Sequence, residues 1–428
     1  MKIYPKILVV SHNCFSKHGS NGRTLGNLFI NWPKESLAQF YINNELPNSE
    51  VCNNYFRITD IEVLNSYYKR KNIGTHITDL IKETDNEDSV NNSKKFNELY
   101  RKSRKKTNFK YIVRNLLWNM NKWRKKEFQI WVEKFNPDLI LLQIGDYSFM
   151  HRIALDLSKL RGIPIILYNS EDYYFKDKKS LSPLYHLFRF GYKRQFENVI
   201  NYSSHSIYNS KMLQDTYLKK FDHESSVIMT STEIEPSPDK KKNESITFSY
   251  LGNLGVGRHE PLIEIANTLH EIDSNLFLDL YGSVPDGIIG KLLSECDSIR
   301  LKGFVSYEQV KKVLMESDVL VHAENFSEYY QWDLKHAFST KIADYLASGT
   351  CFLCYAPSNF ASTKYLLDNK VAFVVTEKKH LKKILQELLE CENNRQIFSG
   401  AALEISKFNH NIIKNSWKFE KIILQSIN

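Results

Sequence analysis

Short runs of apolar residues alternate with longer stretches of helical periodicity along the whole chain. This alternation is typical of parallel sheets covered by helices, and so of an α/β protein. In the first half of the chain the apolar runs predict strands at 6–10, 37–42, 139–143, 164–167 and 206–208. In the second half they predict strands at 247–251, 276–281, 299–302, 319–322, 351–355 and 372–375.

The pattern is interrupted once, by a polar segment at 231–245 that contains two prolines and three consecutive lysines. A chain of 428 residues suits two domains of roughly 200 residues each. We therefore expect a first domain at 1–230, a linker at 231–245 and a second domain at 246–410. The first domain is expected to carry a basic, aromatic insertion at about 65–130. The last helix, at 411–428, is a candidate to cross back to the first domain.

Composition narrows the class of protein. Hydrophobic residues make up 42% of the chain and charged residues 25%, as in ordinary folded proteins, which argues against disorder. No apolar stretch approaches the ~20 residues of a membrane-spanning helix, and the N-terminus lacks a signal-peptide core, so a cytoplasmic location is expected. The six cysteines are scattered and imply no disulfide framework. Cys351 and Cys354 share one strand but point to opposite faces, so they are interpreted as core residues.

The net charge of +9 is unevenly spread. Residues 101–126 hold eleven Lys and Arg and no acid, with Trp118, Trp123 and other aromatic residues interleaved. A basic, tryptophan-bearing helix is attracted to an anionic membrane surface, and we interpret the segment that way. The alternative, a solvated basic face with its aromatic residues in the core, stays open. No nucleic-acid-binding module accompanies the charge, so nucleic acid is not an expected partner.

Two glycine-bearing loops follow predicted strands. The first contains Gly19 and Gly22 ahead of a helix, whose free N–H groups suit a diphosphate or a sugar. It matches neither the dinucleotide-binding fingerprint nor the P-loop pattern. The second runs from Gly252 and Asn253 to Arg258, and that guanidinium can bind phosphate oxygens in a bidentate manner. The alternative reading is a surface arginine on a glycine turn.

The segment 338–349 predicts a short helix, with Ser339 or Thr340 as N-cap and Gly349 just past its end. Lys341 and Asp344 share one face of it. A carboxylate there can accept both hydroxyls of a ribose, while the lysine and the helix N-terminus hold a diphosphate. The alternative is an exposed Lys–Asp pair of little energetic value. The opposite, apolar stripe consists of Ile342, Tyr345 and Leu346.

The segment 339–349 resembles the S-K-I-x-E-Y-L-A-x-G signature of retaining family 4 glycosyltransferases. The segment 250–254, followed by Arg258, is similar to the phosphate loop of the same family. The pair 278–282 and 301–305 resembles the segments that frame its base pocket. The resemblance implies a GT-B fold, in which two Rossmann-like domains have parallel sheets facing a central cleft. It also implies that the first domain binds the acceptor and the second binds the nucleotide-sugar, with Asp344 in the place of a ribose-binding glutamate.

The sequence departs from the family pattern at two places. A glutamate expected eight positions before Asp344 is replaced by His336, so the acid facing the anomeric carbon is Glu324 or Glu328, and retention or inversion stays open. A histidine expected after a middle strand of the first domain is also missing. Glu171 or Asp172 stands there and can orient or deprotonate the acceptor hydroxyl. Two histidines near the proposed cleft, His12 and His322, are interpreted as structural.

These features together predict a glycosyltransferase. It would move a sugar from a nucleotide diphosphate sugar to a hydroxyl of a glycan or a lipid-linked glycan, in the synthesis of a capsule, lipopolysaccharide or other surface polysaccharide. No cofactor and no protein-bound metal are expected, because Arg258, Lys341 and a helix N-terminus would stabilise the charge of the departing diphosphate. Two alternatives remain: a nucleotide-sugar epimerase of the same fold, and a polysaccharide-binding scaffold without catalysis.

Overall fold

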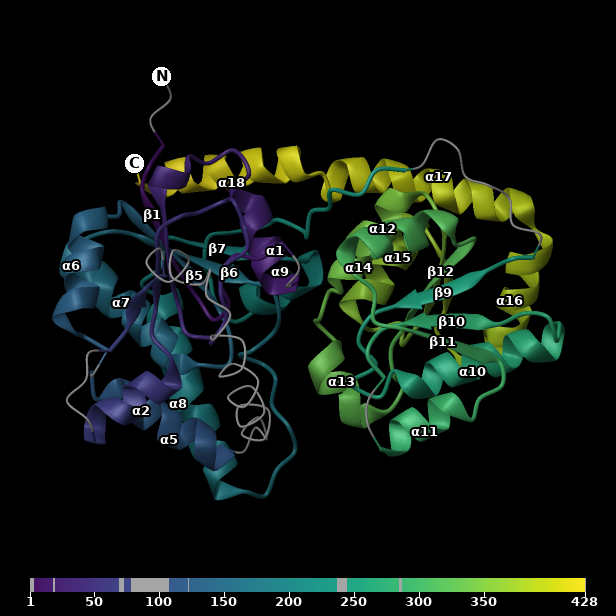
Figure 1. The fold of residues 1–428 in the computed structure, drawn as a ribbon, viewed down its shortest axis with the longest axis horizontal. Helices are drawn as coiled ribbons and strands as arrows, with labels where there is room; N and C mark the ends of the chain where they lie inside the picture. The colour runs from purple at the N-terminus through teal and green to yellow at the C-terminus, as the bar shows by residue number, and fades with distance from the viewer. Residues whose placement is uncertain are drawn as a thin grey trace, which may run out of the picture. The chain divides into compact units, whose positions relative to one another are not determined.

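The computed structural model describes residues 4–17, 20–68, 73–77, 108–121, 123–236, 245–284 and 287–427. The chain divides into two compact units (Figure 1). Unit 1 comprises residues 1–208, 214–227 and 416–428, and unit 2 comprises residues 209–213 and 228–415. Each unit is a sheet covered by helices, and each is described by itself below.

The sheet of unit 1 has the strand order β4-β3-β2-β1-β5-β6-β7-β8. Every neighbouring pair is parallel except β3 and β4, which are antiparallel. The central strands β1, β2, β5 and β6 are buried along their whole length, as expected for strands covered on both faces. The strands are β1 (Ile7–Ser11), β2 (Leu37–Tyr41), β3 (Tyr55–Arg57), β4 (Thr75–His76), β5 (Leu139–Gln143), β6 (Ile165–Asn169), β7 (His205–Tyr208) and β8 (Ser225–Val227).

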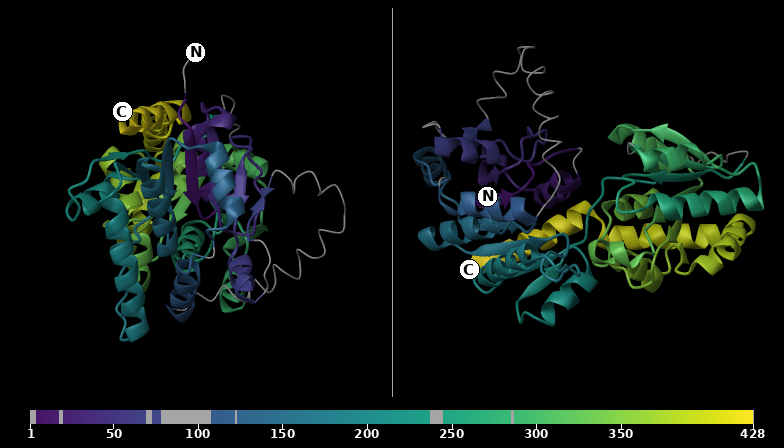
Figure 2. Two further views of the ribbon diagram at one scale, coloured as in Figure 1. Left: turned by 90° about the vertical axis from the view of Figure 1, so that its left-hand side faces the viewer. Right: turned by 90° about the horizontal axis from the view of Figure 1, so that it is seen from below.

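The last helix of the chain packs on unit 1, close to its first helices (Figures 1 and 2). The Phe29 and Phe419 rings meet edge to face at 5.0 Å, and Asn31 Nδ2 donates to Ser416 Oγ at 3.2 Å. The helices are α1 (Ser20–Gly26), η1 (Asn27–Phe29), η2 (Lys34–Ser36), α2 (Asp60–Tyr68), α5 (Asn108–Asn119), α6 (Lys126–Phe135), α7 (Ser148–Arg161), α8 (Pro183–Ile200), α9 (Lys211–Leu218) and α18 (Ile412–Ile427).

The sheet of unit 2 is parallel throughout, with the strand order β11-β10-β9-β12-β13-β14. Its strands are β9 (Phe248–Leu251), β10 (Leu278–Tyr281), β11 (Ile299–Gly303), β12 (Val319–Ala323), β13 (Cys351–Tyr355) and β14 (Phe373–Val375). Its helices are α10 (His259–Ile272), α11 (Ile288–Ser294), α12 (Tyr307–Glu316), α13 (Glu328–Leu334), α14 (Thr340–Ser348), α15 (Ala361–Asn369), η3 (Lys378–His380), α16 (Leu381–Glu390) and α17 (Glu392–Asn409).

Each sheet reverses its winding direction at one point. In unit 1 the chain winds outward from β1 on one side and from β5 on the other, and these two strands are neighbours. In unit 2 the neighbours at the reversal are β9 and β12. Ligands of open α/β sheets bind beyond the carboxyl ends of the strands at such switch points. The fold therefore directs attention to the residues that follow β1 and β5, and to those that follow β9 and β12.

Each predicted strand is present, with ends shifted by at most two residues. The short strands β3, β4 and β8 were not predicted, because two or three residues carry too little periodicity to be recognised. Cys351 and Cys354 are buried in β13, which confirms their interpretation as core residues, and all six cysteines are free. Much of the predicted insertion at 65–130, and residues 237–244 of the predicted linker, lie outside the described residues.

The helix predicted in the segment 338–349 is α14. Its N-cap is Ser339, although the Ser339 side chain makes no capping hydrogen bond, and Gly349 follows it with a φ of +68°. The apolar stripe is buried as expected. Among the described residues, no helix is both long enough and apolar enough to span a membrane.

We predict opposite effects from two glycine substitutions in helices of unit 1. A Cβ atom at Gly22 would lie 2.4 Å from Cys14 O, so Gly22→Ala should lower the free energy of unfolding by about 1–3 kcal/mol. A Cβ atom at Gly191 of α8 would meet nothing within 4 Å, so Gly191→Ala should raise that free energy by about 0.5–1 kcal/mol. Urea unfolding followed by tryptophan fluorescence measures both. Equal stability of the two variants would contradict the close packing of α1.

Candidate functional site

Three polar side chains come together at the switch point of unit 2. Arg258 ends the glycine loop that follows β9, Glu324 directly follows β12, and Lys341 lies in the first turn of α14. Because β9 and β12 are parallel neighbours, their carboxyl ends lie at one edge of the sheet. The sequence predicted Arg258 and Lys341 as one group and considered Glu324 as an added acid. The structure brings all three together.

Arg258 and Glu324 form a two-pronged ion pair. Nε and Nη2 of Arg258 donate to Oε2 and Oε1 of Glu324, each at 2.8 Å. Both side chains are largely removed from solvent, with 16% of Arg258 and 5% of Glu324 exposed. Burial opposes the charge of the guanidinium, but the Glu324 carboxylate outweighs it, and the pKa of Arg258 is raised. Arg258 is therefore a fixed cation, with Nη1 left close to the Asn253 carbonyl at 3.5 Å.

Lys341 is the exceptional group of the site. Its Nζ atom is buried, and no hydrogen-bond partner for it exists among the described residues. It lies 4.3 Å from the centroid of the Tyr250 ring. Burial, and after it the positive charge of Arg258, lower the pKa of Lys341 to about 7, while the Glu324 carboxylate acts in the opposite direction. A buried amine without a partner is costly, so the arrangement favours an anion that would supply one.

The glycine loop is shaped to leave room for this amine. A Cβ atom at Gly252, where φ is +139°, would lie 2.5 Å from Lys341 Nζ. At the far end of the loop, Gly257 has a φ of +72°, and Asn325 Nδ2 donates to its carbonyl at 2.8 Å. Asn253 Oδ1 accepts from the backbone N–H of Gly255 at 2.7 Å. Of the predicted loop residues, Gly252 thus lies against Lys341, whereas Asn253 contacts Gly255 and Arg258.

His322 lies beside the ion pair in the interior of β12. Its side chain is 1% exposed, and its Nε2 atom is 3.5 Å from Glu324 Oε1. Burial, together with the charges of Lys341 and Arg258, keeps its pKa well below the usual range, so the ring is neutral. Its assignment as a structural histidine stays a prediction.

Asp344 makes a contact that the sequence did not indicate. It is 5% exposed, which excludes the exposed Lys–Asp pair considered as an alternative. Thr232 Oγ1 donates to Asp344 Oδ1 at 2.5 Å. Of the two acids considered for the anomeric carbon, Glu324 is in the site, whereas Glu328 begins α13 with an exposed side chain.

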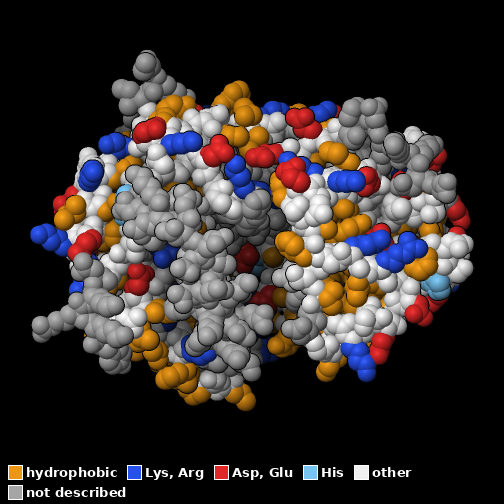
Figure 3. All heavy atoms as spheres, viewed as in Figure 1, with side chains coloured by type: hydrophobic (Ala, Val, Ile, Leu, Met, Phe, Trp, Pro, Cys, Tyr) orange, Lys and Arg blue, Asp and Glu red, His pale blue; other side chains and the backbone are white. Residues whose placement is uncertain are grey.

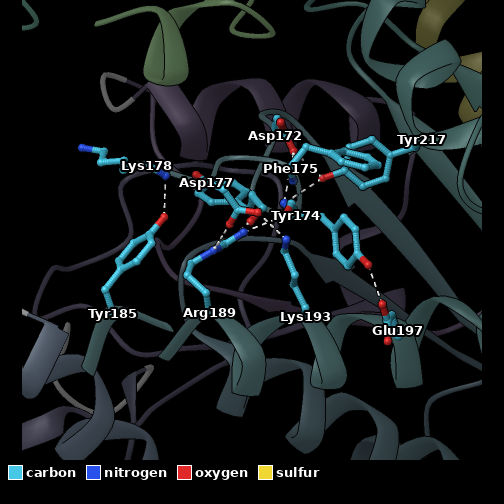
Figure 4. A network of polar contacts seen from close by, with 11 residues as sticks. Asp172, Tyr174, Phe175, Asp177, Lys178, Tyr185, Arg189, Lys193, Glu197 and Tyr217 are labelled. Atoms are coloured by element: carbon cyan, nitrogen blue, oxygen red, sulfur yellow. Dashed lines mark hydrogen bonds and ion pairs between the residues drawn. The ribbon is translucent and has the colours of Figure 1, made fainter. Parts of the chain in front are cut away.

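In unit 1, Asp172 organises the loop that follows β6 (Figure 4). Its Oδ1 atom accepts hydrogen bonds from the backbone N–H groups of Tyr174 and Phe175 at 3.1 and 2.9 Å, and from the Tyr217 hydroxyl at 2.9 Å. Arg189 of α8 donates to the carbonyls of Tyr173 and Tyr174 at 3.0 and 2.6 Å, and so fastens the same loop.

Glu171 is the more accessible of the two acids predicted for the acceptor. It lies next to Tyr173, whose pKa is raised well above its usual value by burial and then by the Glu171 charge. Gly19 lies outside the described residues. Gly22 packs closely against Cys14 and Ser16, and its place among the donor-binding residues stays a prediction.

Comparisons with known proteins agree with this architecture. No protein-family model matches the chain, and no curated protein sequence matches it. Among solved structures, HepE of Anabaena in complex with UDP and glucose is similar over 98% of this chain and 99% of its own, with 12% identity and a TM-score of 0.63. A sucrose-phosphate synthase of Thermosynechococcus elongatus is similar over 99% of both chains, with 13% identity and a TM-score of 0.63. WaaG, a glycosyltransferase involved in lipopolysaccharide biosynthesis, covers 97% of this chain and 99% of its own, with 11% identity and a TM-score of 0.58.

The chain has a GT-B fold. Its two α/β units, one built on a mainly parallel sheet and the other on a wholly parallel one, are the Rossmann-like domains that the sequence predicted for a GT-B protein. Two residues that contact the candidate site were given no role of their own in the sequence analysis. Tyr250 was assigned to a strand and to the segment that resembles a phosphate loop, and Thr232 was assigned to a linker. Only the tertiary contacts to Lys341 and Asp344 reveal them.

We predict that Lys341 titrates close to pH 7 in the unliganded protein, where an exposed lysine titrates near 10.4. NMR of protein carrying ¹³C-ε-labelled lysine measures this. Arg258→Leu should raise the midpoint, because a neighbouring cation is lost, and Glu324→Gln should lower it, because a neighbouring anion is lost. Lys382, which is exposed and 3.3 Å from Glu271, provides the control resonance. A Lys341 midpoint near 10 in all three proteins would contradict the buried, unpaired amine.

Proposed function

We propose that this protein is a glycosyltransferase that moves a sugar from a nucleotide diphosphate sugar to a hydroxyl of a glycan or lipid-linked glycan. The observation that carries the proposal is the buried, unpartnered amine of Lys341 beside the Arg258–Glu324 pair, at the switch point of unit 2. Solved structures of HepE with UDP-glucose and of the lipopolysaccharide enzyme WaaG, both of similar fold, support this choice of donor and reaction.

In the proposed reaction, the charged groups of the site first bind the donor and then stabilise the departing diphosphate. A bound diphosphate would supply the missing partner of Lys341 and favour its protonated form. As the bond to the sugar breaks, negative charge grows on the diphosphate, and Arg258 and Lys341 would stabilise it. Glu324 keeps the guanidinium in place through its two hydrogen bonds. We propose that these groups do so without a resident metal or cofactor, and that the reaction retains configuration.

For the other half of the reaction, Glu171 is our candidate for orienting the acceptor hydroxyl. Asp172 is the weaker candidate, because its Oδ1 atom already accepts three hydrogen bonds. Glu324 remains the candidate acid for the anomeric carbon. The donor-binding set proposed from the sequence includes Gly252, Asn253, Ser339 and Thr340. We also propose that the product is a surface polysaccharide made on the cytoplasmic side of the membrane.

A nucleotide-sugar panel tests the function directly. The purified protein is incubated with each donor, with and without glycan acceptors, and the products are followed by mass spectrometry. A glycosyltransferase releases nucleoside diphosphate and extends the acceptor only when both substrates are present. Conversion of the donor to an epimer without an acceptor would identify the epimerase alternative, and binding without any reaction would identify the scaffold.

We predict that Arg258→Ala and Lys341→Met each reduce turnover by roughly a hundredfold or more at saturating donor, in the range of a lost oxyanion donor. Arg258→Lys should recover only part of the activity, because an ammonium group cannot reproduce the two-pronged contact with Glu324. Lys382→Met, at an exposed lysine of unit 2, is the matched control and should turn over at the wild-type rate. Turnover at the wild-type rate in both Arg258→Ala and Lys341→Met would contradict the proposed stabilisation of charge.

The proposed membrane contact needs a different set of residues from the one the sequence indicated. Trp118 and Trp123 are 1% and 4% exposed, so the tryptophans belong to the core and cannot insert into lipid. Residues 101–107 and 122 lie outside the described residues. Hydrophobic side chains are instead exposed over α5 and α8, at the lower end of unit 1 in Figure 3. This α5–α8 patch consists of Phe109, Leu116, Met120, Leu181, Leu184, Leu187 and Phe190.

We propose that the α5–α8 patch docks on an anionic membrane, where a lipid-linked acceptor would be available. Exposed basic side chains, which anionic headgroups attract, are present on α5, on α8 and in the segment before α8: Lys110, Arg194, Lys178 and Lys179. We predict that Leu187→Glu combined with Phe190→Glu abolishes sedimentation with anionic liposomes, and that wild-type binding falls with added salt. Ile397→Glu, at an exposed residue of α17, is the control. Equal recovery of the wild type with neutral and anionic vesicles would contradict the docking.

A further inference from the structure

Asp344 lies one turn along α14 from Lys341, yet the hydrogen bond to its Oδ1 atom comes from Thr232. Both residues are buried, with Asp344 5% and Thr232 7% exposed. A buried carboxylate is retained only where hydrogen bonds compensate for its lost hydration. The Thr232 contact therefore belongs to the interior of unit 2, and it links α14 to the segment in which the chain returns to that unit at Ile228.

Thr232 is itself held firmly. Its backbone N–H donates to His410 O at 3.0 Å, its Oγ1 atom accepts from the N–H of Ile234 at 3.0 Å, and it forms a parallel bridge with Asn411. The ring of His410 bonds to Thr230 O at 2.7 Å and to the Tyr365 hydroxyl at 3.0 Å. The entering segment 230–234 and the leaving segment 409–415 are thus joined into one hydrogen-bonded support.

The first turn of α14 depends on this support. Its N-cap residue, Ser339, makes no side-chain capping hydrogen bond, so the helix start is not stabilised by its own sequence. The preceding residue, Phe338, stacks on the His410 ring with an interplanar angle of 20°. Contacts to the support at Phe338 and at Asp344 therefore flank Lys341 in the chain, and they fix the turn that carries it.

We propose that Asp344 is a positioning residue: through Thr232 it holds the first turn of α14 so that the Lys341 amine lies beside Gly252 and Arg258, and it does not touch the nucleotide. This inference rests on the proposed function, because it concerns the same anion site. It assigns Asp344 a role different from ribose binding. The role needs a hydrogen-bond acceptor at position 344 and not a negative charge, since Asp344 is not among the charges that shift the pKa of Lys341.

Pyrophosphate separates the two roles, because it has the diphosphate but no ribose. Calorimetry would compare pyrophosphate with the tightest-binding member of UDP, GDP, ADP and dTDP. Asp344→Ala and Thr232→Val should each weaken both ligands by about tenfold, the scale of one buried hydrogen bond. The double variant should be weakened by clearly less than the sum of the two single effects, because both substitutions remove the hydrogen bond between Thr232 and Asp344. Asp344→Asn keeps an acceptor for Thr232 and should bind within about twofold of the wild type.

The pH dependence of pyrophosphate affinity distinguishes a positioning role of Asp344 from a general loss of stability, because a loss of stability would not shift it. Wild-type affinity should fall as the pH rises above about 7, because the unliganded Lys341 loses its proton there. In Asp344→Ala and Thr232→Val the amine gains water, so the onset of this fall should move to higher pH. Asp344→Asn and Thr232→Val are close in shape to the native residues, and amide hydrogen exchange checks that unit 2 remains folded.

Two results would overturn the inference. If Asp344→Ala weakens the nucleoside diphosphate but leaves pyrophosphate unchanged, Asp344 binds the ribose. If the Asp344 and Thr232 variants add independently, the contact does not act as a unit. In either case Lys341→Met would still weaken pyrophosphate. Undiminished pyrophosphate binding by Lys341→Met would instead overturn the proposed function, and the support would then have no anion site to position.

Discussion

The site of unit 2 depends on the cost of burying two cationic side chains beside a single carboxylate. Both oxygens of Glu324 accept from Arg258, and within the described part of the chain the Lys341 amine has no hydrogen-bond partner and lies beside the Tyr250 ring and the glycine loop. Neighbouring like charge and burial both act against its proton. A site in this state gains most from a ligand that carries more than one negative charge. A diphosphate carries such a charge. The shortage of negative charge around the two cations is therefore the physical basis of the proposed reaction.

The surrounding fold holds the two cationic side chains and the single carboxylate in these positions. Parallel strands β9 and β12 bring the glycine loop and Glu324 to one edge, while α14 delivers Lys341 from a third direction. Glycine is favoured at position 252 because φ there is +139° and because a Cβ atom would lie 2.5 Å from the Lys341 amine. The place of the amine is set by α14, which carries Lys341 in its first turn. That helix is held by the hydrogen bond from Thr232 to Asp344 and by the stacking of Phe338 on the His410 ring.

In unit 1 the buried polar contacts stabilise a loop. Asp172, Arg189 and Tyr217 tie the loop after β6 to α8 and α9, so this loop is ordered by its own hydrogen bonds and needs no ligand (Figure 4). The same α8 exposes leucine and phenylalanine side chains on its outer face. A rigid loop on one side and an apolar surface on the other are consistent with a unit that receives an acceptor close to lipid.

The sequence by itself determined the α/β class, the positions of the long strands and the glycine, arginine and lysine residues of the site. Those features are local: periodicity, turn residues and short motifs are written in neighbouring positions. Only the tertiary structure decided which groups neutralise one another. Glu324 and Arg258 are 66 residues apart, and Thr232 and Asp344 are 112 apart, so no local pattern pairs them. The burial of Trp118 in the core, against its interpretation as a membrane anchor, was likewise decided by packing, because an amphipathic helix presents the same sequence to a protein interior and to a lipid surface.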